Sequence, residues 1–217
     1  MLGCSHDLPP RGNYFAWNAY VQQNLHAGTM FNRSGAPLLI VPDECLVAVV
    51  RTLEEEWGEE QATEILRSIA TAWGRRAGEQ LVQEVTAFYG RSFMDLPLAM
   101  VTAVLTEAFR HHGWGTFRLD FSRYVHGIVI VEVDNPLEGS IARPDCGALD
   151  HILSGLLSGM WSYLAGRELG CLQTDARGRG ASVSRFILTV PERLMGRSAG
   201  LPHDEALAEL CQCTTAS

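Results

Sequence analysis

Apolar residues recur at intervals of three and four along the first half of the chain, and this spacing predicts amphipathic helices. The helical segments that it predicts are 43–57, 59–89 and 94–112. Asp43 is a candidate N-cap for the first segment, and Gly90 follows the second, where a glycine commonly ends a helix. The first half of the chain is therefore expected to be mostly α-helical.

The period of the pattern changes to two at residue 116. Residues 116–121 ("TFRLDF") alternate apolar and polar positions, and 127–134 ("GIVIVEVD") follow as a second strand, so the pair predicts an antiparallel hairpin. A helix over 145–166, two strands within 167–190 and a short terminal helix follow. This order predicts an α+β fold, with an antiparallel sheet of about four strands covered on one face by helices.

The chain divides into three parts. Residues 1–37 are rich in Gly, Pro, Asn and Ser, which predicts an irregular N-terminal arm. The aromatic residues of this arm either cover the core of their own chain or contact another copy. Residues 38–191 hold the periodic segments and form the main domain, and 192–217 form a C-terminal tail with a short helix.

Composition narrows the possible functions. The formal net charge is −8, whereas general nucleic-acid binders usually carry a basic face, so no nucleic-acid partner is expected. No apolar run is long enough to predict a transmembrane segment, and the N-terminus lacks the basic and apolar pattern of a secretion signal. The expected location is the cytoplasm, with the six cysteines reduced.

The stretch "CLQTDARGRGASVSRFIL" (171–188) allows three interpretations. As a phosphate cradle it lacks the lysine and the following helix of a P-loop. As a tight turn between two strands it has Gly178 and Gly180, which supply the backbone freedom that such a turn needs. The third interpretation, the remnant of a metal site, comes from a family resemblance.

From about residue 38 to 190 the chain resembles the 4-vinyl reductase, or hydrocarbon-binding, domain family. The resemblance rests on five segments in order: "ATAWGRRAGEQL", "HHGWGTFRLDF", "VIVEVDNPLEG", "ILSGLLSGMWSYLAGREL" and "GRGASVSRFIL". It implies a homodimeric α+β domain that holds a small hydrophobic or tetrapyrrole ligand between helices and sheet. It also implies an accessory role in photosynthesis, at the 4-vinyl reduction step of bacteriochlorophyll biosynthesis.

The same resemblance bears on metal binding. Members of the family with a metal site hold zinc with thiolates, and the positions of those cysteines fall here on Ala176 and Ser184. A structural zinc needs about four ligands. The resemblance therefore implies that no metal is bound, and no cofactor is expected besides a tetrapyrrole as ligand.

A second resemblance supports an alternative function. The segments "GWGTFRLDF", "IVIVEVD" and "LSGLLSGMWSYLAGR" are similar to the small D subunit of bacterial cellulose synthase complexes. This resemblance implies an oligomeric structural or assembly subunit. The glycine pairs Gly74/Gly78 and Gly155/Gly159 permit close helix approach, either within one chain or between chains.

The candidate ligand-binding residues are aromatic, sulfur-containing or titratable side chains expected between the helices and the sheet. They are Trp73, Phe109, His111, Trp114, Phe117, Tyr124, His126, Met160 and Trp161. A ligand pocket is mostly apolar with a few polar anchors, and the histidines and Tyr124 are candidates for that role. The alternative is that the aromatic residues fill the core and that His111, with its neighbour His112, closes a helix.

No motif in the sequence predicts catalysis. The chain has no Gly-x-Ser-x-Gly, no dinucleotide fingerprint and no HExxH. The glutamates within 54–60 are typical of a solvated helix face. A non-catalytic binding module is therefore the expected function, and an enzyme accessory to vinyl reduction is the less favoured one.

Overall fold

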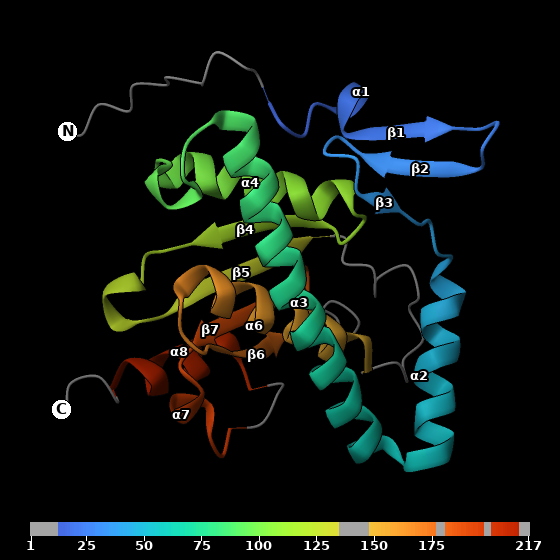
Figure 1. Ribbon diagram of the computed structural model, residues 1–217. Coiled ribbons are helices and arrows are strands. Elements are labelled where there is room, and N and C mark those ends of the chain that lie inside the picture. Colours follow the sequence, from blue (N-terminus) through green and yellow to red (C-terminus); the bar gives the residue numbers. More distant parts are fainter. Residues whose placement is uncertain (1–12, 135–147, 177–180, 198–200, 213–217) are drawn as a thin grey trace.

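The computed structural model describes residues 13–134, 148–176, 181–197 and 201–212. In these residues a four-stranded sheet forms the middle layer, with long helices on one face and short C-terminal helices on the other (Figure 1). The expected α+β class is confirmed.

The main sheet is built from two hairpins. Its strands are β4 (Thr116–Asp120), β5 (Val129–Asp134), β6 (Gly170–Asp175) and β7 (Ser184–Thr189). They lie in the order β4-β5-β7-β6, and each neighbouring pair is antiparallel. The pairing of β6 with β7 agrees with a turn between them, although residues 177–180 of that turn lie outside the described residues.

Both faces of this sheet carry apolar residues. Phe117 and Phe186 are buried on the face that meets the long helices. Ile130 and Ile187 are buried on the other face, where helix α8 (His203–Gln212) packs on them. The expectation that helices cover one face only is therefore wrong, because strands β5 and β7 place large apolar side chains on both sides.

The remaining helices keep close to their expected bounds. They are α2 (Asp43–Trp57), α3 (Glu59–Tyr89), α4 (Leu98–His111) and α6 (Ala148–Ala165). A short helix that the sequence analysis did not predict, α7 (Pro191–Leu194), follows β7, where a loop was expected. Asp43 is the first residue of α2 rather than its cap, because Pro42 holds the cap position. The helix expected from residue 94 begins at Leu98, after a single 3-10 turn, η1 (Phe93–Asp95), because Pro97 disfavours helical backbone in the residue before it. Among the described residues, no helix combines the length and the apolar character needed to cross a membrane.

The helices α3 and α6 approach each other backbone to backbone at their glycines. A methyl group added at Gly74 would lie closer than 3.0 Å to the backbone of Leu156, and one at Gly159 would lie closer than 3.0 Å to the backbone of Thr71. The two glycine pairs are therefore used for helix packing within the chain. Their presence consequently gives no independent support to an assembly role.

The N-terminal arm is more regular than the expected irregular segment. It contains a short helix, α1 (Trp17–Tyr20), and an antiparallel sheet of β1 (Val21–Asn24), β2 (Thr29–Asn32) and β3 (Pro37–Leu38). The side chains of Tyr14, Phe15 and Tyr20 are buried in the main core. The arm thus covers the core of its own chain, which was one of the two interpretations of its aromatic residues.

Candidate ligand-binding cavities

Most of the candidate residues line one of two cavities. The first, here called the arm-side cavity, lies between the arm, α3, α4 and α6, and it contains Trp73, Phe109, Trp114 and Met160. The second, here called the η1–η2 groove, lies between η1, the start of α4, η2 (Tyr124–His126) and the end of α6, and it contains Tyr124 and Trp161. Sequence spacing had placed all nine candidates in one pocket, and the structure divides them.

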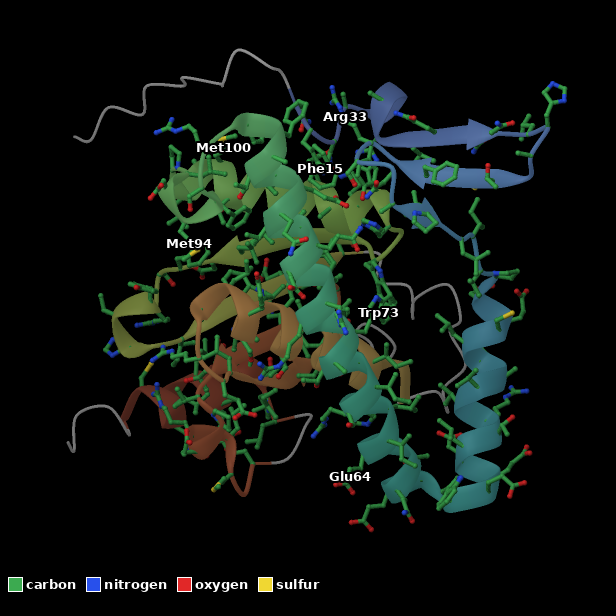
Figure 2. The ribbon with its side chains drawn as sticks, in the orientation of Figure 1. Phe15, Arg33, Glu64, Trp73, Met94 and Met100 are labelled. Atoms are coloured by element: carbon green, nitrogen blue, oxygen red, sulfur yellow. The ribbon has the colours of Figure 1, made fainter. Side chains whose placement is uncertain are left out.

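The arm-side cavity has a volume of about 380 Å³. Phe109 and Met160 are buried in its interior, whereas Trp73 remains 44% exposed. Figure 2 shows Trp73 on the side of α3 that faces the arm and α2. The rings of Trp73 and Trp114 meet edge to face with their centroids 5.2 Å apart. The cavity therefore has an apolar interior and a partly exposed aromatic edge.

A tyrosine–histidine pair provides one polar group of the arm-side cavity. The ring nitrogen Nδ1 of His112 lies 2.7 Å from the carbonyl oxygen of Ala108. A carbonyl can only accept, so Nδ1 carries the proton and Nε2 of the neutral ring is an acceptor. The hydroxyl of Tyr20 lies 3.1 Å from this Nε2 and donates to it. The Tyr20 oxygen has two lone pairs, of which one interacts with the side-chain amide of Asn32 and the other can accept a hydrogen bond from a ligand.

Glu84 provides the second polar group and attaches the arm to α3. Its Oε2 accepts a hydrogen bond from the Tyr14 hydroxyl at 2.7 Å. Its Oε1 accepts from Asn32 Nδ2 at 2.7 Å, from the Ser34 hydroxyl at 2.8 Å and from Gln80 Nε2 at 2.7 Å. Three of these four donors belong to the arm, so this carboxylate helps to hold the arm over the cavity, together with the buried arm aromatics.

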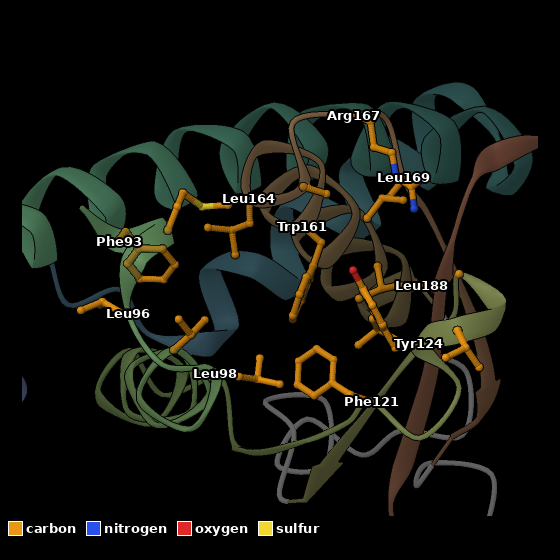
Figure 3. Close-up of a pocket in the computed structure, with 16 residues that line it drawn as sticks. Phe93, Leu96, Leu98, Phe121, Tyr124, Trp161, Leu164, Arg167, Leu169 and Leu188 are labelled. Carbon is orange, nitrogen blue, oxygen red and sulfur yellow. The ribbon is translucent and has the colours of Figure 1, made fainter. Parts of the chain in front are cut away.

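The η1–η2 groove is larger, with a volume of about 880 Å³. Trp161 points toward Phe121 across it, with the ring centroids 6.1 Å apart (Figure 3). The indole nitrogen of Trp161 is buried and has no hydrogen-bond partner among the described residues. Tyr124 is 69% exposed at the edge of the groove, and Arg167 adds a charged side chain. The groove is an apolar channel at the opposite end of α4 from the arm-side cavity.

Three candidate residues line neither cavity. Phe117 stacks on Phe109 with ring centroids 3.8 Å apart, so it fills the core. His111 ends α4, where its Nε2 lies 3.5 Å from Glu107 Oε2. His126 ends η2, and its backbone carbonyl accepts a hydrogen bond from Arg193. In these three cases the structure favours the core-filling or helix-closing alternative.

The sequence analysis missed five polar residues that line the arm-side cavity, namely Tyr20, Asn32, Arg76, Gln80 and Glu84. One signal was present. Glu84 lies seven residues after Ala77 and three after Leu81, which places an acidic residue on the apolar stripe of the helix. Tyr20 gave no comparable signal, because the arm has no regular period.

The residues around Cys171 do not fit a zinc site. Burial raises the pKa of the Cys171 thiol to about 12, which opposes the thiolate form that zinc binds. Ser184 is buried on the neighbouring strand β7, and Cys146 lies outside the described residues. No group of three or more His, Cys, Asp or Glu side chains in the described ranges is arranged to hold a metal.

Comparison with known proteins gives matches by fold. No protein-family model matches the sequence, and no curated protein does. The chain is similar to the phenol-responsive sensory domain of the transcription activator PoxR, with a TM-score of 0.64 and 15% identity over 90% of this chain and 95% of that one. It is also similar to a trafficking protein particle complex subunit 3 from Naegleria fowleri covalently bound to palmitic acid, with a TM-score of 0.52 and 12% identity over 65% of this chain and 88% of that one.

A vinyl-4-reductase family protein from Methanocaldococcus jannaschii matches less well. Its TM-score is 0.46 at 10% identity, over 70% of this chain and 83% of that chain. At identities this low, the matches to PoxR and the trafficking subunit describe a shared fold alone.

Proposed function

We propose that the protein is a non-catalytic binding module that takes up a small, mostly apolar aromatic ligand in the arm-side cavity. The observation that carries the proposal is the construction of that cavity. Buried Phe109 and Met160 form its apolar interior, and Trp73 with Trp114 forms its aromatic edge. The Tyr20–His112 pair supplies a polar anchor. An apolar wall with a few convergent polar groups is typical of small-molecule sites.

The volume favours a ligand of about one ring. A buried apolar cavity of about 150 Å³ already holds benzene, and ligand pockets begin at about 300 Å³. The arm-side cavity, at about 380 Å³, has room for a substituted single ring. The similarity in fold to a phenol-responsive sensory domain supports the same ligand class.

A tetrapyrrole in bacteriochlorophyll biosynthesis is the second candidate, and it rests on the family resemblance. A tetrapyrrole macrocycle needs more room than a single ring, so its place in this chain would be the η1–η2 groove of about 880 Å³. Tyr124 is the candidate anchor that lines this groove. His111, His112 and His126 do not line it, which makes the tetrapyrrole the less favoured ligand.

Titration calorimetry with phenol, toluene and benzamide tests the proposed site. The wild-type protein is expected to bind at least one of them with one ligand per chain. Ala77→Phe extends a ring into the arm-side cavity, because Ala77 lines it, and should abolish binding. Ala72→Phe is the matched control, because Ala72 is an exposed residue of the same helix that does not line the cavity. Equal binding by both variants would place the ligand elsewhere.

Self-association is a separate proposal supported by exposed apolar side chains. They lie along the segment before α2, on α2 and on the first half of α3: Leu39, Ile40, Val41, Val49, Trp57 and Ile69. Side chains of this kind at the surface are typical of protein interfaces. We therefore propose a homodimer that uses this surface. Sedimentation velocity of wild-type protein and of Trp57→Glu should show a dimer that the charge converts to monomer, and a monomeric wild-type protein would contradict the proposal.

A further inference from the structure

Glu84 is an acidic residue in the wall of the arm-side cavity whose hydrogen-bond partners are all uncharged. Its four donors are the hydroxyls of Tyr14 and Ser34 and the side-chain amides of Asn32 and Gln80. It forms no ion pair with any residue in the described part of the chain. Its charge is therefore retained in the cavity wall without a direct counter-ion.

The geometry around Glu84 favours the ionised form. Burial opposes ionisation, but the hydrogen bonds outweigh that effect, and the pKa of Glu84 is lowered. A carboxylate that accepts several hydrogen bonds stays charged at neutral pH. The wall of the cavity therefore presents a negative charge rather than a neutral carboxyl group.

The negative charge of Glu84 changes the pKa of Tyr20, which lines the same cavity. Tyr20 has a phenol side chain that is buried at 2% exposure. Burial raises the pKa of its hydroxyl, and the charge of Glu84 raises it further. A phenol ring held in this wall is thus kept in its neutral form. An anionic ligand in the same cavity meets the same two effects, because it loses water and lies near a like charge.

The other charged side chain that lines the cavity does not cancel this effect. Arg76 is an exposed residue of α3, eight positions before Glu84. Solvent screens an exposed charge more strongly than a half-buried one, and Glu84 is half-buried whereas Arg76 is exposed. The charge of Arg76 therefore acts more weakly in the cavity than that of Glu84.

We infer that Glu84 is a specificity-determining residue, which makes the arm-side cavity accept uncharged aromatic compounds and reject aromatic carboxylates of the same size. The inference rests on the proposed function, because it concerns the ligand of that same cavity. The ligand class that it names is small neutral aromatics whose N–H or O–H group can donate to the remaining lone pair of the Tyr20 oxygen. Glu84 acts at two levels, since it also fixes the arm that forms part of the wall.

Benzamide and benzoate are the probes that test this inference. They have nearly the same shape and differ in charge at neutral pH. Titration calorimetry at pH 7 should give wild-type protein an affinity for benzamide at least about ten-fold above that for benzoate, because a like charge lies in the wall. Glu84→Gln keeps the size of the side chain and removes the charge. It should reduce the ratio of the benzamide affinity to the benzoate affinity at least about three-fold.

Matched variants separate the charge from other effects. Glu79→Gln removes a charge from the same helix at a residue that does not line the cavity, and it should leave the ratio within about two-fold of wild type. Equal affinities of wild-type protein for benzamide and benzoate would overturn the inference, and this result does not require that Glu84→Gln folds. A benzamide-to-benzoate affinity ratio that is the same in Glu84→Gln as in wild type would also overturn it. If neither these probes nor phenol and toluene bind, the proposed function itself fails. These results are distinguishable, because the first two require measurable benzamide binding.

Discussion

The close contact between α3 and α6 leads to the strongest prediction, which concerns Gly74→Ala. A Cβ atom at Gly74 would lie 2.9 Å from the carbonyl carbon of Leu156 and 2.9 Å from the amide nitrogen of Met160, and closer still to the Leu156 oxygen. These atoms belong to the backbone of α6, so no side-chain rotation relieves the overlap. The two helices must separate along a contact that belongs to the main core.

The magnitude follows from two opposing contributions. Overpacking costs about 1–3 kcal/mol and occasionally more, and the upper end applies because the obstacle is backbone. Alanine is a better helix former than glycine by about 1 kcal/mol, which offsets part of that cost. The expected net loss in the free energy of unfolding is about 2 kcal/mol or more. For a chain of this size that loss lowers Tm by about 4–8 °C.

Gly78→Ala is the matched control on the same helix. A Cβ atom there would lie 3.3 Å from the Met160 Cγ and 3.3 Å from the Met160 carbonyl oxygen, a contact that a few tenths of an ångström relieve. Its free energy of unfolding should stay within about 1 kcal/mol of wild type. Urea unfolding followed by circular dichroism measures both variants. Equal stabilities for Gly74→Ala and Gly78→Ala would refute the packing argument.

Three further predictions follow from the remaining contacts. Cys171 should resist alkylation by iodoacetamide at pH 8, because burial raises the pKa of its thiol to about 12, whereas the exposed Cys45 should react. Mass spectrometry of the labelled peptides measures both reactions. Rapid labelling of Cys171 in the folded protein would contradict the prediction. The pKa of Glu84 in the folded state lies below its ordinary value of 4.5, so ionised Glu84 stabilises the fold above pH 4.5, and this stabilisation is lost as the pH falls through the folded-state pKa. The free energy of unfolding of Glu84→Gln should therefore fall less steeply on acidification than that of wild type. Parallel curves of unfolding free energy against pH for the two proteins would exclude this role. Arg185 pairs with Glu132 at 2.9 Å and with Asp175 at 2.7 Å, and these three residues lie on three strands of the main sheet. Because solvent screens these pairs, Arg185→Gln should lower the free energy of unfolding by about 1 kcal/mol or less. A difference in unfolding free energy that does not shrink in 1 M salt would argue against an electrostatic origin.

The helices and the main sheet could be predicted because their periods are long and regular. The apolar spacing over 43–57 and 59–89 matches α2 and α3 to the residue. The sheet of the arm could not be predicted, because β1 ("VQQN") has one apolar residue and β3 is two residues long. Strands this short and this exposed carry no alternating pattern that distinguishes them from a loop.

Six of the nine candidate residues line a cavity, but the sequence did not predict that they would be divided between two cavities. Met160 and Trp161 are adjacent in the sequence, and adjacent residues point about 100° apart around a helix. Met160 therefore reaches the arm-side cavity while Trp161 reaches the η1–η2 groove. Sequence spacing identifies the buried stripe of a helix, but it does not say which neighbouring elements meet each side of that stripe. Those neighbours here include the arm, whose position depends on long-range hydrogen bonds to Glu84.

Glu84 connects the position of the arm to the choice of ligand. Its hydrogen bonds to Tyr14 and Asn32 hold the arm in place, and the arm in turn supplies Tyr20 and Leu38 to the cavity wall. A ligand that contacts these wall residues binds the protein with the arm in this position, so its binding energy adds to the stability of that arrangement. Loss of Glu84 therefore weakens every ligand through the arm and strengthens anionic ligands through the charge. The ratio of two affinities cancels the first effect and keeps the second, which is why the ratio, rather than either affinity, reveals the role of the charge.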